Sequence, residues 1–238
     1  MIASPGQARA SARRNRSSMA RSAAVTGEAS ALRSIRREED RKYRSASFWT
    51  IDPIDGTRAF SRGLPSWGIL LGRVEHGQPV LGACDFPALD TFLGVAPGLP
   101  AYERRGRTRT ALRRAPKPPV LSKAVLFHGG SQWWLGTKYA AGFARLVRGC
   151  FLERAYGDCY GYLWVFRGRA DAVLDYGVKI WDLVPLAALA RATGRVMTNF
   201  AGRPGFSGPE SILAHPALAR RISRVLKGVR PLKNGGLT

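Results

Sequence analysis

From residue 48 onward, short runs of apolar, aromatic and β-branched residues alternate with clusters of Gly, Pro, Asp and Asn. Runs of about 4–8 such residues between turn-forming clusters predict β-strands. Where consecutive runs are separated by short turns, the strands can pair as an antiparallel meander. The predicted strands span Phe48–Ile51, Trp67–Val74, Val80–Asp85 and Thr91–Val95, and another is expected at Val120–Phe127.

Beyond residue 128 the pattern changes to an alternation of helices and strands. Four apolar residues between positions 139 and 147 recur at i, i+4, i+7 and i+8, which predicts one face of a helix. A helix is also expected to begin near Asp182, with Pro185 in its first turn, where proline is tolerated. The remaining predictions are a strand at Phe151–Tyr156, a helix at Cys159–Arg167, a strand at Ala170–Tyr176 and a helix from Pro216.

These elements predict a fold of the α+β class, with layered sheets and helices. Residues 1–47 lack apolar periodicity and are expected to be an atypical, basic and poorly ordered segment. The folded domain spans residues 48–238. Within it, residues 48–127 form an antiparallel sheet lobe and residues 128–238 an αβα lobe. The basic, proline-rich Arg104–Pro119 is expected to be a surface connection.

The charge of the chain is strongly unbalanced, with 38 Lys and Arg against 16 Asp and Glu, a net of +22. Such a charge attracts nucleic acids and anionic membranes without specificity. However, 31 of the cations are Arg, and no basic run is interleaved with aromatic residues for stacking on bases. We therefore expect that any nucleic-acid binding is non-specific.

The sequence also limits the compartment. No stretch reaches the roughly 18 apolar residues that a membrane-spanning helix requires, so no membrane partner is expected. Three scattered cysteines are too few for a disulfide framework or a cysteine-based zinc site, which indicates a reducing compartment. We expect a cytoplasmic protein, with organellar targeting by the Arg- and Ser-rich residues 1–27 as the alternative.

The segment Asp52–Thr57, with the sequence Asp-Pro-Ile-Asp-Gly-Thr, carries the candidate chemistry. Asp52 follows an apolar strand, and Asp55 can turn back toward the same point three residues later. Gly56 permits a tight backbone, so that the Gly56 and Thr57 amides can face an anion at the start of a helix. Two carboxylates beside an anion site are suited to a metal ion that bridges protein and phosphate.

A third acid, Asp182, follows Trp181 at the start of the apolar helix. No His or Cys accompanies these acids, so the candidate ligands are all oxygen atoms. Oxygen ligands favour Mg²⁺ or Mn²⁺ over Zn²⁺.

These residues resemble a known family. Asp52–Thr57 is similar to the first signature of the inositol monophosphatase-like phosphatases, and Lys179–Asp182 followed by Pro185 resembles their second. The resemblance covers Trp49–Leu226 and implies a layered αβαβα sandwich of the inositol monophosphatase/fructose-bisphosphatase type. Three segments look most similar to the histidinol-phosphate phosphatase branch: Gly56–Phe60, Leu64–Gly68 and Tyr156–Tyr160.

The resemblance implies a site with two or three Mg²⁺ ions, with Mn²⁺ as a substitute. Asp52 would bridge two ions, the carbonyl of Ile54 would join the first, and Asp55 and Asp182 would hold the second.

The resemblance also implies roles toward the substrate. Thr57 and the amides of Gly56 and Thr57 would position the phosphate and the attacking water. Asp158 and Asp175 correspond to positions that contact the alcohol portion of the substrate.

The N-terminus departs from the family pattern. Members carry a Gly-Glu-Glu segment whose first Glu binds metal and helps to activate water. Gly27-Glu28, 24 residues before Asp52, is the nearest equivalent, so Glu28 is the expected metal ligand, with Glu38–Asp40 as the alternative. The family's N-terminal helices have no counterpart in residues 1–26, and we expect them to be missing or altered. A shifted reading frame or a wrong start is our hypothesis for this difference.

The resemblance implies Mg²⁺-dependent hydrolysis of a small phosphorylated alcohol by metal-activated water. The expected reaction converts L-histidinol phosphate to L-histidinol and phosphate, a step of histidine biosynthesis. Inositol 1-phosphate and a 3′-phosphonucleotide are alternative substrates. An inactive phosphatase homologue and a basic nucleic-acid-binding protein are the alternatives of another class. A homodimer is a further expectation.

Overall fold

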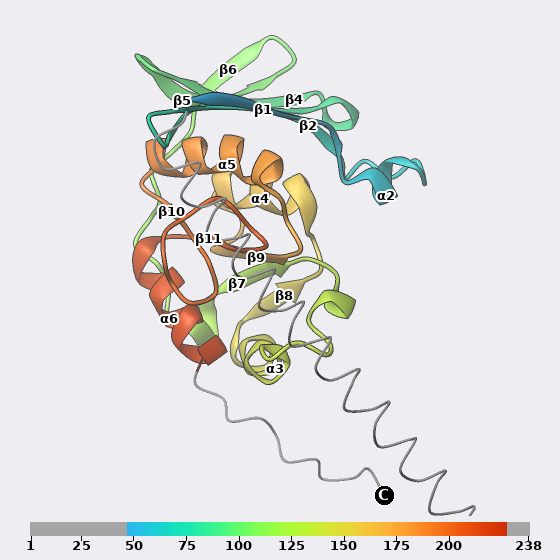
Figure 1. Ribbon diagram of the computed structural model, residues 1–238, viewed down its shortest axis with the longest axis vertical. Coiled ribbons are helices and arrows are strands. Elements are labelled where there is room, and N and C mark those ends of the chain that lie inside the picture. Colours follow the sequence, from blue (N-terminus) through green and yellow to red (C-terminus); the bar gives the residue numbers. More distant parts are fainter. Residues whose placement is uncertain (1–46, 228–238) are drawn as a thin grey trace, which may run out of the picture. The chain divides into compact units, whose positions relative to one another are not determined.

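Two β-sheets and the helices packed against them form the layers of the structure, a computed structural model that describes residues 47–227 (Figure 1). The first sheet has six antiparallel strands in sequence order, as a meander requires. Its strands are β1 (Phe48–Asp55), β2 (Gly68–Glu75), β3 (Gln78–Phe86), β4 (Thr91–Ala96), β5 (Leu99–Arg105) and β6 (Thr108–Ala111). The meander predicted from the sequence is confirmed.

The second sheet has the order β10-β11-β9-β7-β8. Strand β7 pairs in parallel with β8 and with the central strand β9, whereas β11 pairs antiparallel with β9 and β10. Its strands are β7 (Val125–His128), β8 (Leu152–Arg154), β9 (Ala172–Tyr176), β10 (Val196–Thr198) and β11 (Glu210–Ala214).

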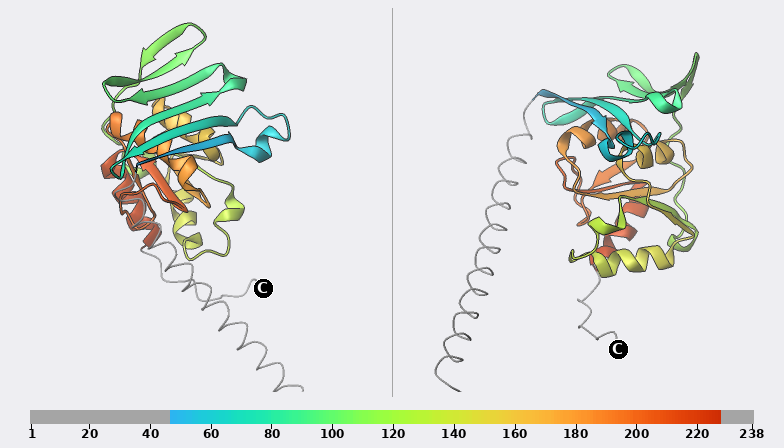
Figure 2. Two further views of the ribbon diagram at one scale, coloured as in Figure 1. Left: turned by 45° about the horizontal axis from the view of Figure 1, so that its top comes forward. Right: turned by 90° about the vertical axis from the view of Figure 1, so that its right-hand side faces the viewer.

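The helices form two layers. Helices α4 (Asp158–Phe166) and α5 (Ile180–Ala192) lie between the sheets, and α3 (Ala140–Gly149) and α6 (Pro216–Lys227) cover the other face of the second sheet (Figures 1 and 2). The short elements are α2 (Thr57–Phe60) and the 3-10 turns η1 (Pro87–Leu89), η2 (Leu121–Lys123) and η3 (Ser131–Trp133). None of the helices in residues 47–227 has the length and apolar character needed to cross a membrane.

The described layers are therefore sheet, helices, sheet, helices, which agrees with the expected α+β sandwich from its second layer onward. The predictions for residues 1–46, which concern the first helical layer of that sandwich, lie outside the described residues.

Two apolar cores hold the layers together. One lies between the sheets and includes Phe86, Leu163 and Leu186, and the other lies between the second sheet and α3 and α6 and includes Leu146 and Ile212. Burial of such side chains is the main stabilising term of the fold, at about 1.5–3 kcal/mol for each large apolar group.

Two boundaries differ from the predictions. The region Arg104–Pro119, expected to be a connection, contributes the end of β5 and all of β6, whose residues are exposed and so lack an apolar alternation. The strand predicted at Val120–Phe127 begins only at Val125, because residues 121–123 form η2.

Since β7 belongs to the second sheet, the division between the lobes precedes residue 125 and does not fall after residue 127.

Helix α5 packs unusually close to the first sheet. Pro185 is the sixth residue of α5 and not part of its first turn as predicted. It lies over Gly72 and Gly82, which are direct partners on β2 and β3. A Cβ atom on Gly82 would lie 2.2 Å from the Pro185 carbonyl oxygen, so only glycine permits this approach. The glycine pair therefore sets the depth at which α5 lies on the sheet.

We expect Gly82→Ala to lower the free energy of unfolding by at least about 2 kcal/mol, because the added methyl group meets backbone that cannot move away alone. Gly205→Ala is the matched control, since its Cβ would meet no atom within 4 Å. Denaturant titration of both variants measures the difference. Equal midpoints for the two variants would contradict this account of the packing.

Candidate metal centre

Three aspartates from two distant segments converge at one edge of the layered structure. Asp52 and Asp55 come from the end of β1, and Asp182 comes from the first turn of α5. Carboxylate oxygens of the three lie within 4.8 Å of one another. The structure thus brings together the three acids that the sequence suggests as partners in one metal site.

A bulge in β1 places two of these acids on the same side of the strand. Asp52 pairs with Leu70 and Asp55 with Gly68, so three steps along β1 match two along β2. In a regular strand, side chains three residues apart point to opposite faces. The extra residue removes this alternation, so that both carboxylates face the same site. The Ile54 amide donates a hydrogen bond of 3.0 Å to Asp52 Oδ1 and holds the turn.

Asp182 is positioned by the start of α5. Its Oδ2 accepts a hydrogen bond of 2.7 Å from the backbone N–H of Lys179, the residue that caps the helix. A carboxylate in the first turn also interacts favourably with the helix dipole. The same interaction that begins the helix therefore orients the third acid of the site.

Asp55 is the most buried of the three acids, with 8% of its surface exposed. Its Oδ2 accepts a hydrogen bond of 2.5 Å from the backbone N–H of Cys159 at the start of α4. Gly68, the partner of Asp55 on β2, leaves room for Cys159, because a Cβ there would lie 3.0 Å from its Sγ atom. The site is thus joined to α4 as well as to β1 and α5.

The charges of residues 47–227 do not neutralise Asp55 and Asp182. Burial, with the nearby Asp158 carboxylate as the next largest cause, raises the pKa of Asp55 to about 6. Burial also raises the pKa of Asp182 to about 8, with the charge of Asp55 as a further cause. Each shift has two causes, the loss of water around the carboxylate and the repulsion by neighbouring acids. No nearby cation among the described residues offsets these two effects.

The turn after Asp55 takes the conformation expected from the sequence. Gly56 has φ +78°, and a Cβ there would lie 2.8 Å from the Ser66 carbonyl oxygen, so the position requires glycine. The helix that follows, α2, has only one turn, so its dipole is small. The Thr57 hydroxyl is exposed and donates a hydrogen bond of 2.9 Å to the Ile54 carbonyl oxygen. Both groups to which the resemblance assigns a role therefore lie beside the aspartates.

Asp158 and Asp175 are adjacent but have different environments. Asp175 on β9 is 4% exposed, and its two oxygens accept hydrogen bonds from the N–H groups of Asp158 and Tyr176. Burial and the charge of Asp158 raise the pKa of Asp175 well above its usual value. Asp158 begins α4, is exposed and has φ +54°. Only Asp158 presents its carboxylate to the surface, and Asp175 holds the backbone that carries it.

Two features of this region have little signal in the sequence. A Cβ on Gly129 would lie within 2.1 Å of an Asp175 oxygen, so the loop after β7 closes directly over that carboxylate. Arg58 lies over the ring of Trp133 at 5.0 Å, and its charge partly lowers the pKa of Asp158, which partial burial raises. Both contacts join residues far apart in the chain. Glu28, the expected fourth metal ligand, lies outside the described residues.

The residues present fit a divalent cation. The donors are all carboxylate oxygens, which Mg²⁺ and Mn²⁺ prefer, and they lie close enough to share an ion. The raised pKa values of Asp55 and Asp182 indicate that the described residues around them supply too little positive charge, which a bound cation would add.

The stability of the metal-free protein should therefore depend on pH. An unfolded Asp releases its proton near pH 4, whereas folded Asp55 retains it up to about pH 6 and Asp182 up to about pH 8. The folded state binds more protons in this range, so the free energy of unfolding should fall as pH rises from 4 to 8 in the presence of a chelator. Chemical denaturation at several pH values measures this slope.

Asp55→Asn is the control for this prediction, because it removes the ionising group and keeps an oxygen that can accept the Cys159 hydrogen bond. Its unfolding free energy should vary less between pH 4 and 7. Addition of Mg²⁺ or Mn²⁺ at pH 8 should raise the melting temperature of the natural protein and leave that of Asp55→Asn nearly unchanged. Parallel pH profiles for the two proteins would contradict the assigned environment of Asp55.

Comparison with known proteins gives a consistent result. The model of the inositol monophosphatase family matches residues 15–229. A histidinol-phosphatase of Streptomyces coelicolor is 31% identical over 66% of this chain and 60% of its own length. A probable inositol 1-monophosphatase of Mycobacterium tuberculosis is 31% identical over 71% of this chain and 63% of its own length. The chain therefore spans less than two thirds of the length of these two relatives.

A solved structure shows the same fold. The inositol monophosphatase from Zymomonas mobilis superposes with a TM-score of 0.68 at 28% identity, over 76% of this chain and 70% of that one. The agreement in fold extends over most of the described residues.

Proposed function

Because the chain belongs to the inositol monophosphatase family, we propose that it is a phosphoric monoester hydrolase that acts with divalent metal ions. The observation that carries the proposal is the convergence of Asp52, Asp55 and Asp182 within 4.8 Å. Phosphate monoesters are dianions, and three carboxylates alone would repel them. The cluster can bind such a substrate only when cations lie between the two sets of negative charge, which favours a metal-dependent reaction.

We assign Mg²⁺ as the metal, with Mn²⁺ as a substitute. Asp52, Asp55 and Asp182 would hold the ions, with the Ile54 carbonyl as a further oxygen ligand. When bound, the ions would neutralise the phosphate and make water a stronger nucleophile at neutral pH. The hydrogen bond from Lys179 to Asp182 and that from Cys159 to Asp55 fix the orientation of two ligands before any ion binds.

Residues around the cluster would position the reactants. The Thr57 hydroxyl is exposed beside the aspartates, where it can bind the phosphate or the water, and the amides of Gly56 and Thr57 can donate to phosphate oxygens. Cys159 is an unsuitable nucleophile, because it is fully buried and burial raises the pKa of its thiol well above the usual value. Direct attack by water, without a covalent phosphoenzyme, is therefore the mechanism we propose.

L-histidinol phosphate is the proposed substrate. This molecule carries an ammonium group and an imidazole next to its phosphate ester. Asp158 offers an exposed carboxylate close to Asp55, where it can pair with the ammonium group. The resemblance to the histidinol-phosphatase of S. coelicolor supports the same choice. Inositol 1-phosphate is the second candidate, supported by the resemblance to the M. tuberculosis protein.

Asp52→Asn should reduce the Mg²⁺-stimulated release of phosphate by at least about 100-fold, because it removes a charge that holds the cation. Asp90→Asn is the matched control. Asp90 is exposed at the end of η1, is not one of the three clustered aspartates, and has a φ of 44° that asparagine also adopts. A phosphate-release assay with L-histidinol phosphate compares the two variants. Full activity in Asp52→Asn would refute the assignment of the metal centre.

Asp158→Asn should affect KM for the two candidate substrates differently. Its φ of +54° is accessible to asparagine, so the start of α4 is expected to be preserved. We expect KM for L-histidinol phosphate to rise about 10-fold, because the ammonium group loses its charged partner, while KM for inositol 1-phosphate changes by less than about 2-fold. Steady-state kinetics with both substrates test this. An equal change for both would indicate that Asp158 does not recognise the ammonium group.

A further inference from the structure

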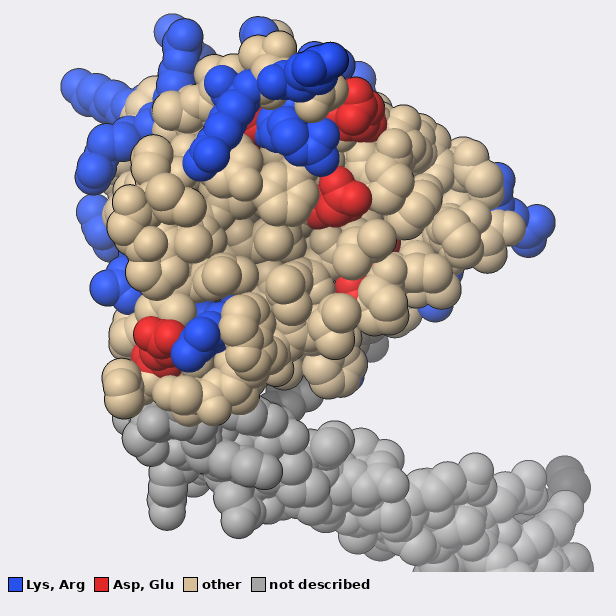
Figure 3. Space-filling model, turned by 90° about the horizontal axis from the view of Figure 1, so that it is seen from above, with Lys and Arg blue, Asp and Glu red and all other residues tan. Residues whose placement is uncertain are grey.

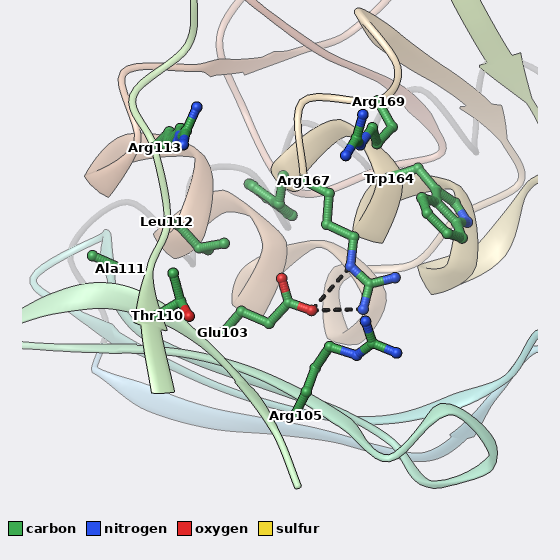
Figure 4. Close-up of a pocket in the computed structure, with 10 residues that line it drawn as sticks. Glu103, Arg105, Thr110, Ala111, Leu112, Arg113, Trp164, Arg167 and Arg169 are labelled. Carbon is green, nitrogen blue, oxygen red and sulfur yellow. Dashed lines mark hydrogen bonds and ion pairs between the residues drawn. The ribbon is translucent and has the colours of Figure 1, made fainter. Parts of the chain in front are cut away.

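A cleft outside the metal centre has the opposite charge. It has a volume of about 410 Å³ and is formed by β5, the end of β6 with the segment after it, and the end of α4 with the turn that follows (Figure 4). This volume lies in the range of small-molecule sites, about 300–1,000 Å³. Four arginines line the cleft, Arg105, Arg113, Arg167 and Arg169, together with the single acid Glu103. The lining therefore carries a net charge of three positive units.

Three of these guanidinium groups have no partner in the described part of the chain. The side chains of Arg105, Arg113 and Arg169 make no ion pair or hydrogen bond with any of residues 47–227. Only Arg167 is paired, through hydrogen bonds of 3.0 and 2.6 Å from its Nε and Nη2 atoms to Glu103 Oε1. Figure 4 shows Arg105 pointing toward Arg167 from the opposite wall. Like charges that face each other in this way favour an anion between them.

The walls of the cleft are held in place by buried contacts. The Arg167 side chain is only 14% exposed and also donates a hydrogen bond of 3.1 Å to the Thr91 hydroxyl. Behind the cleft, Arg195 donates to the carbonyl groups of Arg113 and Val165 and connects the two sides. The backbone of both walls and the Arg167 side chain are therefore fixed, whereas the exposed side chains of Arg105, Arg113 and Arg169 are free to turn toward a ligand.

The neighbouring surface adds to the positive potential. Lys and Arg side chains gather over the edge of the first sheet where β5 and β6 lie, and most of the rest of that face is neither basic nor acidic (Figure 3). A field of one sign around a cleft raises the local concentration of oppositely charged ligands.

The cleft is distinct from the metal centre. Helix α4 begins at Asp158, beside the aspartates, and ends at Phe166, which lines the cleft. Its nine residues correspond to a rise of about 12 Å. One end of the helix therefore meets a cluster of acids, and the other meets a cluster of arginines.

From these observations we propose that the cleft binds a small polyanion with several linked phosphate groups. A single phosphate would fill little of the volume and could reach few of the separated guanidinium groups. A chain of phosphates can contact groups on both walls, and guanidinium groups bind phosphate oxygens in pairs. Inorganic tripolyphosphate and the triphosphate of a nucleotide share this chemistry.

Calorimetric titration of the full chain with tripolyphosphate, ATP and adenosine tests the proposal. A chelator is present throughout, so that the aspartate cluster holds no cation and repels phosphates. We expect tripolyphosphate and ATP to bind and adenosine not to bind. Similar affinity for tripolyphosphate and ATP would show that the phosphates alone are recognised, and tighter binding of ATP would show that the base contributes. Failure of both to bind would overturn the proposal.

Matched variants distinguish binding in the cleft from attraction by the net charge of the protein. The triple variant Arg105→Ala/Arg113→Ala/Arg169→Ala should weaken tripolyphosphate binding by at least about 10-fold. The control Arg148→Ala/Arg220→Ala/Arg224→Ala removes the same charge from exposed positions on α3 and α6 and should weaken it by less than about 3-fold. Equal weakening in the two variants would show attraction by net charge and overturn the proposal.

Glu103→Gln provides a test of opposite sign. It removes the only acid of the lining and leaves Arg167 without a charged partner, so tripolyphosphate should bind about 3-fold or more tightly. Unchanged or weaker binding, with a cooperative melting transition retained, would contradict the proposal. Phosphate release from L-histidinol phosphate is measured in parallel. A loss of that activity with tripolyphosphate binding intact would count against the proposed function and leave the proposal for the cleft unaffected.

Discussion

Mutual repulsion among three carboxylates is the constraint around which the described structure is organised. Asp52, Asp55 and Asp182 lie within 4.8 Å of one another, and no element would place them so by local preference alone. The bulge in β1, the start of α5 and the start of α4 each contribute one backbone amide that holds one of these carboxylates. Part of the free energy gained when the layers pack therefore offsets the repulsion between these carboxylates. A site built in this way gains stability from a divalent cation.

The close packing of α5 on the first sheet follows from the same requirement. Asp182 can reach the end of β1 only if the first turns of α5 lie low over β2 and β3. Gly72 and Gly82 allow this approach at Pro185, one turn after Asp182. A larger residue at either glycine would raise the helix and draw Asp182 away from the strand. The glycine pair therefore connects the packing of the core to the geometry of the site.

Helix α4 joins two regions of opposite charge. Its first turn supplies the Cys159 amide to Asp55 and presents Asp158, and the turn after its last residue supplies Arg167 and Arg169 to the cleft. The acids at one end are suited to cations, and the arginines at the other are suited to anions. The large net positive charge of the chain is therefore distributed unevenly, since the metal centre is acidic within a basic protein.

Much of this structure follows from local patterns in the chain. The meander from Phe48 to Val95, the helices near Asp182 and Pro216, and the turn at Gly56 have local signals, because alternation, helical spacing and turn residues act over a few positions. The hairpin of β5 and β6 was not predicted, because its exposed strands lack an apolar face. The start of β7 was placed too early, because apolar residues before it enter a 3-10 turn.

The sequence by itself determined which residues have the chemistry to bind a metal and which segments carry them, since carboxylates and tight turns are properties of short stretches. Only the tertiary structure decided that Asp158 is exposed while Asp175 is buried, that the bulge aligns Asp52 with Asp55, and that arginines from distant segments line one cleft. These features depend on the distance and orientation between elements far apart in the chain. The packing of the layers sets these distances and orientations, and no local sequence pattern encodes that packing.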